Sequence, residues 1–255
     1  MYAATTGVQN VAVGVNALKS TTSNPYTGSF STAVGVNALA SATSGHSNTA
    51  LGFQAADNLT TGYYNIAIGH HTLGAITDNT NNVGIGYSTL VGATGNSNIA
   101  IGTNAGMTTT TGGNNFIVGL NATASSATVS NEITLGNSSH NSLRCNTQTI
   151  SSLSDARDKT NVIDLPEGLD FVSKLRPVKF EWATRDGNSK DGSFEHGFIA
   201  QELQTAQKEN NADYLNMVMD ENPDRLEASY GKLVPILVKA IQELTMEVNK
   251  LKSNG

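Results

Sequence analysis

A short hydrophobic pattern returns along residues 7–140 at an almost constant interval. Each unit is an apolar, small, apolar triplet followed by glycine, as in Val11-Ala12-Val13-Gly14 and Ile66-Ala67-Ile68-Gly69. The eight unit glycines are Gly14, Gly35, Gly52, Gly69, Gly86, Gly102, Gly119 and Gly136, at spacings of 21, 17, 17, 17, 16, 17 and 17 residues. A fixed period of this length predicts stacked repeats, in which each unit contacts its neighbours.

Each unit reads as one coil of a β-solenoid. The triplet predicts a short strand with its large apolar residues on a buried face and its small residue on the other. An asparagine usually precedes the triplet, as at Asn48 and Asn65, where we expect the positive φ of a tight turn. The segment after the glycine, such as Val15-Asn16-Ala17-Leu18, predicts a second strand, and a Ser/Thr/Gly/Asn turn closes the coil.

One coil holds few large side chains, so a single chain gains little from burying them. At ~25 cal/mol per Å² of apolar surface, a thin aliphatic stripe hardly offsets ~1.5 kcal/mol of ordering entropy per residue. We therefore expect coils from several chains to pack against one another.

Charge divides the chain sharply at residue 154. Of the 15 Lys/Arg and 21 Asp/Glu residues, only five precede it, namely Lys19, Asp57, Asp78, Glu132 and Arg144. An abrupt change of composition predicts a domain boundary, which places a β-solenoid fibre domain at 1–153 and a charged domain at 154–255.

The charged part predicts a small α/β domain that ends in a long helix. Helices are expected at 169–175 and 201–208, and paired strands at 178–182 and 195–200. In the last helix, apolar residues are spaced 3, 4, 3, 4 and 3 apart, which is a coiled-coil seam. The seam residues, which we expect to drive trimerisation, are Val234, Leu237, Ile241, Leu244, Val248 and Leu251. β-Branched residues at a and Leu at d favour dimers in isolated coils, but so short a coil should follow the symmetry of the array.

Composition excludes several functions. A net charge of −6 argues against a nucleic-acid-binding surface over the whole protein. The single cysteine, Cys145, excludes an intrachain disulfide framework and a Cys-based zinc site. No apolar run reaches the ~18 residues of a membrane span, and the N-terminus lacks the pattern of a secretory signal. The array's three carboxylates do not stack into the pair that a glycosidase needs. We expect no metal, no cofactor, no nucleic acid and no membrane insertion.

Aromatic residues of the array are candidates for contact with a receptor. Tyr26 lies in the one longer interval, which predicts a surface loop. Tyr63 and Tyr64 are adjacent and suit either stacking on a sugar or packing between coils, with packing favoured. His70 and His71 are also adjacent; three copies of one on a trimer axis suit a metal or anion, but an exposed or stacked pair is the favoured interpretation.

The Asn-x-Ala-Ile-Gly unit resembles the head repeats of trimeric autotransporter adhesins and similar repeats in phage tail fibres. The resemblance covers residues 7–140, with units of ~17 residues against ~14 in the adhesins. It implies left-handed parallel β-rolls from three chains around a three-fold axis.

Four separated motifs of the C-terminal part resemble the intramolecular chaperone domain of phage endosialidases and tail fibres. They are Ser154-Asp155-Ala156-Arg157-Asp158-Lys159, residues 175–182, residues 197–203 and the run from Tyr230 to Leu244. The resemblance implies a domain that trimerises, nucleates folding of the fibre and then cuts itself off at the Leu153–Ser154 bond. Ser154 would be the nucleophile and Lys159 the general base, with Asp155 and Arg157 holding the loop.

This chemistry restricts the local structure. A serine hydroxyl needs a base to take its proton, and a desolvated lysine can be that base. Five residues along a helix turn by about 140°, so Ser154 and Lys159 must lie in a loop or act between chains. The alternative is a helix N-cap at Ser154-Asp155 with Arg157 and Lys159 solvated.

Together these observations predict the distal end of a viral tail fibre. We expect a homotrimer that contacts other virion tail proteins and a host surface receptor, such as a glycan, and that is assembled in the host cytoplasm. Its only enzymology would be one self-cleavage. The alternatives are a cellular trimeric surface adhesin without autoproteolysis, and a membrane-released transcription factor, for which the uncharged array offers no DNA-binding surface.

Overall fold

The computed structural model describes residues 6–19, 25–140, 142–146, 151–185 and 190–254. The chain divides into two compact units, Met1–His140 and Asn141–Gly255. The second unit therefore begins at Asn141, ahead of the composition break at Ser154.

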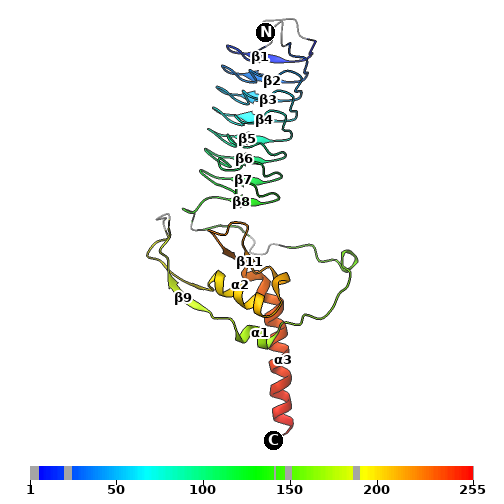
Figure 1. Ribbon diagram of the computed structural model, residues 1–255, viewed down its shortest axis with the longest axis vertical. Coiled ribbons are helices and arrows are strands. Elements are labelled where there is room, and N and C mark those ends of the chain that lie inside the picture. The colour runs from blue at the N-terminus through cyan, green and yellow to red at the C-terminus, as the bar shows by residue number, and fades with distance from the viewer. Residues whose placement is uncertain (1–5, 20–24, 141, 147–150, 186–189, 255) are drawn as a thin grey trace. The chain divides into compact units, whose positions relative to one another are not determined.

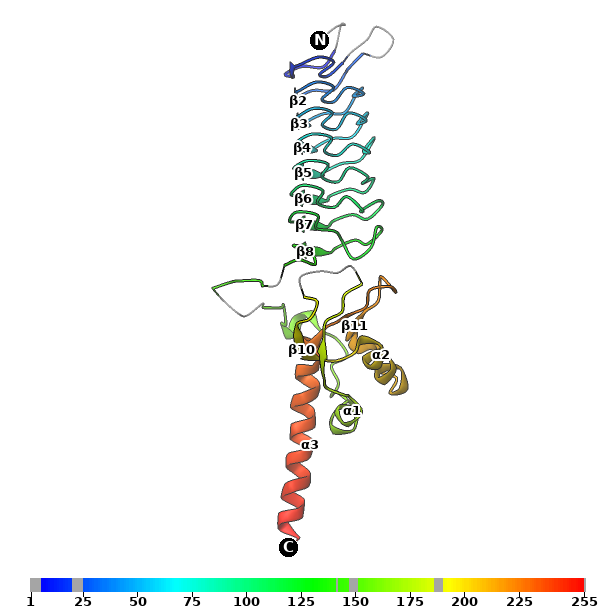
Figure 2. The same cartoon turned by 90° about the vertical axis from the view of Figure 1, so that its left-hand side faces the viewer.

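The first unit is a stack of coils with one short strand each (Figures 1 and 2). The strands are β1 (Val11–Val13), β2 (Thr32–Val34), β3 (Thr49–Leu51), β4 (Ile66–Ile68), β5 (Val83–Ile85), β6 (Ile99–Ile101), β7 (Phe116–Val118) and β8 (Ile133–Leu135). They form one parallel sheet in chain order, with every triplet in register with the next. This confirms the predicted β-solenoid.

The faces of these strands are the reverse of our expectation. The small central residue points into the coil, and Ala33, Ala50, Ala67 and Ala100 are fully buried. The large flanking residues point outward and stay partly or largely exposed, as at Leu51, Ile66 and Ile101. The interior is narrow: at Gly84, a Cβ atom would lie 2.6 Å from Thr72 Cγ2. Beside such neighbours a small residue fits at the strand centre, and the large residues are left on the outside; β7 differs, because its central residue is the fully buried Ile117.

The predicted second strand is also wrong. The segment after each glycine is a turn, in which alternate residues such as Asn37 and Leu39 have φ angles of 59° and 50°. Backbone hydrogen bonds still link these turns from coil to coil, for example from Leu39 N to Ala55 O at 3.1 Å. Each coil therefore has one strand and a hydrogen-bonded turn.

The asparagines before strands β3 to β7 form a buried ladder rather than positive-φ turns, which occur one residue earlier, as at Tyr64. Each Oδ1 accepts a hydrogen bond from the backbone N–H at the equivalent position of the next coil, as in Asn82 N to Asn65 Oδ1 at 3.0 Å. Each Nδ2 donates to a carbonyl, as in Asn82 Nδ2 to Gly95 O at 3.0 Å. The ladder comprises Asn48, Asn65, Asn82, Asn98 and Asn115. It satisfies buried backbone groups that no strand partner reaches.

Tyr26 is a structural residue, not the exposed receptor contact for which it was a candidate. Its side chain is 1% exposed, and burial raises the pKa of its hydroxyl. The hydroxyl lies 2.9 Å from Ser31 Oγ and donates to Gly45 O at 2.7 Å. Ser31 stands where other coils have the ladder asparagine, so Tyr26 supplies the missing donor. Residues 20–24 of this interval lie outside the described residues.

The second unit is a small α/β fold. Its elements are η1 (Ala156–Asp158), α1 (Leu169–Ser173), β9 (Val178–Glu181), β10 (Phe194–Gly197), α2 (Ala200–Glu209), η2 (Asp213–Leu215), β11 (Val218–Met219), β12 (Glu227–Ala228), η3 (Tyr230–Lys232) and α3 (Leu233–Ser253). Strands β9 and β10 pair antiparallel, as do β11 and β12. The predicted helices and the predicted strand pair are confirmed; the β11–β12 pair was not predicted.

Helix α3 has two apolar faces. Leu233, Ile236 and Ala240 are buried, and Leu233 and Ile236 belong to a core that also contains Phe171 and Leu203. The six predicted seam residues lie on another face and are all exposed in the single chain. In the part of the chain that the structure describes, no helix combines the length and apolarity needed to cross a bilayer.

Glu243 of α3 caps the start of α1. Gly168, the N-cap, offers no side chain, and Leu169 N donates to Glu243 Oε2 at 2.7 Å. This hydrogen bond, with help from Lys239, lowers the pKa of the Glu243 carboxyl. The ionised carboxylate thus joins α1 to α3.

We expect Glu243→Gln to lower the melting temperature at neutral pH. A depressed folded-state pKa contributes stability that is present above the ordinary glutamate pKa and is lost as pH falls through the folded value. The deficit of the variant should therefore shrink in acid, because the wild-type carboxyl is then neutral too. Thermal denaturation from pH 7 to pH 3 checks this, and a deficit that stays constant across that range would contradict the assigned role.

Candidate functional site

The segment from Ser154 to Lys159 folds back on itself in one turn. Asp155 is the N-cap of η1, with its Oδ1 accepting from Arg157 N at 2.9 Å, and Lys159 follows in extended conformation. The Lys159 ammonium then lies 2.6 Å from Ser154 Oγ and 3.3 Å from Ser154 O. A short 3₁₀ turn thus brings together, within one chain, two residues that a helix would have separated.

Asp155 and Arg157 hold this turn. Arg157 Nε lies 3.0 Å from Asp155 Oδ1, and its second nitrogen lies 2.6 Å from Oδ2, which makes a bidentate ion pair. The Arg157 hydrogen bonds lower the pKa of the Asp155 carboxyl. Exposed ion pairs contribute little to global stability, so the pair acts on the local shape of the loop. The alternative interpretation was a helix N-cap at Ser154-Asp155 with Arg157 and Lys159 solvated. Asp155 is indeed such a cap, but Lys159 also forms a hydrogen bond with Ser154.

The turn is fully open to solvent. Residues 151–164 are all exposed, and Leu153 shows 101% of its reference surface. A neutral amine in contact with a hydroxyl can take its proton, and burial away from water is what favours a neutral amine. The contact therefore provides the geometry of a Ser–Lys pair without the desolvation that would activate it. The catalytic roles of Ser154 and Lys159 stay predictions.

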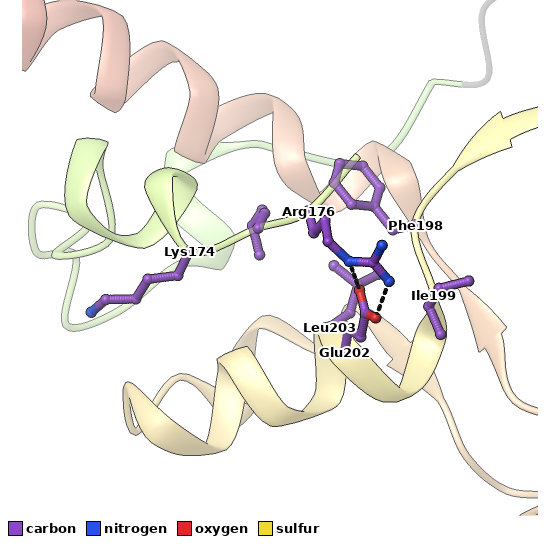
Figure 3. A pocket seen from close by; sticks show the side chains of 7 residues that line it. Lys174, Arg176, Phe198, Ile199, Glu202 and Leu203 are labelled. Atoms are coloured by element: carbon purple, nitrogen blue, oxygen red, sulfur yellow. Dashed lines mark hydrogen bonds and ion pairs between the residues drawn. The ribbon is translucent and has the colours of Figure 1, made fainter. Parts of the chain in front are cut away.

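A second feature lies where α2 begins. Arg176 and Glu202 form a bidentate ion pair, with Arg176 Nε 3.0 Å from Glu202 Oε2, beside a small cavity of about 30 Å³ (Figure 3). The cavity is lined by Lys174, Leu175, Arg176, Phe198, Ile199, Glu202 and Leu203. The hydrogen bonds from Arg176 lower the pKa of Glu202. The cavity is too small for more than about one water molecule; the same ion pair also borders an open groove of about 410 Å³.

Comparison with protein families gave one match, in the C-terminal part of the chain. Residues 154–211 match the family described as chaperone of endosialidase. No curated protein and no solved structure gave a match to the chain. The match confirms the resemblance of this segment to the intramolecular chaperone domain. The segment begins at Ser154 and follows the β-solenoid in the chain.

The chaperone segment, residues 154–211, contains three of the four motifs quoted above, and the fourth lies beyond it. It includes Ser154, Lys159 and the ion pair of Arg176 with Glu202. That ion pair joins the second motif to the third. It was not predictable from the sequence, because two exposed charges 26 residues apart carry no pairing signal. The match supports an assembly and chaperone role for this part of the chain.

Among the described residues, no group of three or more His, Cys, Asp or Glu side chains is arranged to hold a metal ion. His70 instead stacks between Phe53 and Tyr87, with ring centroids 5.1 Å apart on both sides. Tyr63 stacks on His46 at 5.0 Å. Tyr63 thus packs on a ring of the preceding coil, and His70 lies in a stack, which agrees with the interpretation favoured for each pair.

Proposed function

We propose that this chain is the distal part of a trimeric tail fibre whose C-terminal unit assembles three chains and then cuts the Leu153–Ser154 bond. The observation that carries the proposal is the 2.6 Å contact of Lys159 Nζ with Ser154 Oγ at the first residues of the chaperone segment. The exposed Leu153 leaves the bond accessible for cleavage.

The reaction follows from this geometry. Neutral Lys159 takes the hydroxyl proton while Ser154 Oγ attacks the carbonyl carbon of Leu153. The C–N bond then breaks, the Ser154 amine takes a proton, and Leu153 is held as an ester on Oγ. Water hydrolyses the ester, which leaves a carboxylate on Leu153 and restores the hydroxyl. Each chain performs this reaction once, on itself, and no external substrate is involved.

The apolar surfaces of both units support three-chain assembly. The outward strand residues form an uncharged stripe from Val11 to Leu135, and the α3 seam adds a second exposed stripe. Exposed apolar surface of this extent is typical of proteins that associate. Burial of the Ser154–Lys159 turn against a neighbouring chain would supply the desolvation that the single chain lacks.

A fibre of this kind would contact other tail proteins and a host surface receptor, and a glycan suits the uncharged array. The second candidate is a cellular trimeric adhesin, which the repeats alone favour. It does not account for the chaperone segment, because an adhesin without autoproteolysis has no use for the Ser154–Lys159 contact.

We expect the purified chain to yield two fragments, one ending at Leu153 and one beginning at Ser154. Ser154→Ala should abolish the cut, and Lys159→Ala should slow it by about 10²–10⁴-fold, the usual contribution of a general base. Asp158→Ala is the matched control: this neighbouring charge lies in the same turn, but Ser154 bonds Lys159 and not Asp158, so cleavage should persist. Denaturing gels and terminal mass spectrometry measure the products.

Mixed assemblies of Ser154→Ala and Lys159→Ala chains then test where the base comes from. A dyad within one chain gives no product from them, whereas a dyad between chains does. A chain that assembles into trimers and stays intact over days would contradict the cleavage proposal.

A further inference from the structure

Two aromatic groups lie on either side of the outward strand face in the middle of the solenoid. The first, the C-side column, consists of Phe53, His70 and Tyr87, each directly after the unit glycine of its coil. All three are exposed. Their ring planes are within 7° of parallel, and the spacing of 5.1 Å is close to the distance between neighbouring strands.

The second, the N-side cluster, consists of His46, Tyr63 and Tyr64, which precede β3 and β4. His46 and Tyr63 stack at 5.0 Å with an interplanar angle of 3°, and Tyr64 meets both rings edge-on. Tyr63 and Tyr64 are exposed. Between the two groups lie the outward residues of β3 and β4, such as Leu51 and Ile66, which are also exposed.

The stacking restricts what these rings can bind. Both faces of His70 are covered by Phe53 and Tyr87, so the column presents ring edges to its surroundings. A sugar packs against an aromatic face, which the column offers only at its two ends. Edges suit the faces of other aromatic rings, because T-shaped pairs are a preferred arrangement. The column therefore fits an aromatic partner better than a glycan.

Three-fold symmetry requires two different patches that meet, because each interface of a ring of identical chains is heterologous. A pure rotation also keeps equal coils at equal height. The C-side column occupies the levels of β3, β4 and β5, and the N-side cluster occupies those of β3 and β4. The chain thus carries two unlike aromatic patches, at the same heights, on the two flanks of one apolar face.

We propose that the C-side column of one chain packs against the N-side cluster of the next and forms the seam between neighbouring solenoids. The occupant of each patch is a second copy of this chain, and the outward strand residues lie inside the ring. This inference rests on the proposed trimer and adds which side chains meet in it. No charged residue belongs to either patch, so the seam is apolar and aromatic.

Crosslinking tests the seam directly. Two full-length chains are made in a Cys145→Ser background, one with Tyr63→Cys and the other with His70→Cys. The two chains carry different tags and are co-expressed. A short bis-maleimide should join the two chains, and the mixed dimer should appear on a denaturing gel with both tags. Each variant alone should give little product, because like positions do not meet in the ring. Asp78→Cys in place of Tyr63→Cys is the control, and it should give no mixed dimer, because Asp78 lies outside both patches.

Light scattering on the same samples separates the outcomes. Trimers that form the mixed dimer support the seam. Trimers without it overturn the seam but leave the proposed assembly intact, and a parent chain that stays monomeric overturns both. Should a cysteine variant fail to assemble, a photo-reactive phenylalanine analogue at position 70 of the otherwise unchanged chain replaces it. Its inter-chain crosslink must then map to the peptide with Tyr63 and Tyr64, and any other location contradicts the proposal.

Discussion

Replacing Gly69 by alanine is expected to break the solenoid at its centre. Gly69 has a φ angle of 134°, a conformation that residues with a side chain rarely adopt. A Cβ there would lie 2.2 Å from Gly86 O in the next coil. A backbone oxygen cannot rotate away as a side chain can, so the two coils would have to separate. Backbone strain alone costs about 1–3 kcal/mol, and with the clash we expect a loss of about 4 kcal/mol or more.

Thermal unfolding and limited proteolysis measure this loss. Because each coil contacts only its neighbours, new cleavage sites should appear between β4 and β5 first. Gly231→Ala is the control: nothing lies within 4 Å of its Cβ position, and it is outside the solenoid. It should leave the melting temperature almost unchanged. A Gly69→Ala chain as stable as this control would show that the stacked glycines do not fix the coil spacing.

The same glycines explain why the sequence predicted the solenoid register so well. Seven of the eight unit glycines, from Gly14 to Gly119, have φ angles between 128° and 145°, so that each marks the same corner of its coil. A backbone conformation that glycine alone adopts readily leaves a regular series of glycines, and that series is visible in the sequence. The triplets next to these corners became β1–β8 at the predicted positions.

The direction of the strand side chains was not predictable in the same way. Alternation says which residues share a face, but not which face is inside. Hydrophobicity suggested that Ile66 and Ile68 lie inside, whereas coil width decides in favour of Ala67. The width is set by turns such as the one at Thr72, whose methyl group leaves room only for Gly84 opposite. These contacts form between residues far apart in the sequence.

The candidate site was also predictable only in part. Residue types and spacing identified Ser154 and Lys159, and the structure adds the turn through Asp155 that joins them. The ladder role of the asparagines was not visible, because a side chain that bonds the next coil leaves no local pattern. Tyr26 was misassigned for the same reason: it compensates for Ser31, which lacks the ladder amide.

Placing charges in the α3 seam is expected to stop self-cleavage without touching the site. Leu237→Asp/Leu244→Asp puts two carboxylates on the exposed stripe that we propose joins three chains. Burying a carboxylate costs several kcal/mol, and each 1.4 kcal/mol weakens association about tenfold. Since Ser154 and Lys159 are solvated in the single chain, loss of the trimer would remove the burial that we propose makes Lys159 a base.

The matched control is Gln242→Asp/Asn249→Asp, which adds the same two charges, seven residues apart, on exposed positions of α3 outside the seam. It should assemble and cleave like the parent chain, as sedimentation velocity and a cleavage time course will show. The seam variant should sediment as a folded monomer that remains uncut. Two results would count against this coupling. If the seam variant is a monomer and still cleaves at the parent rate, one chain activates its own lysine. If the seam variant still assembles into trimers, the solenoid alone holds the three chains together.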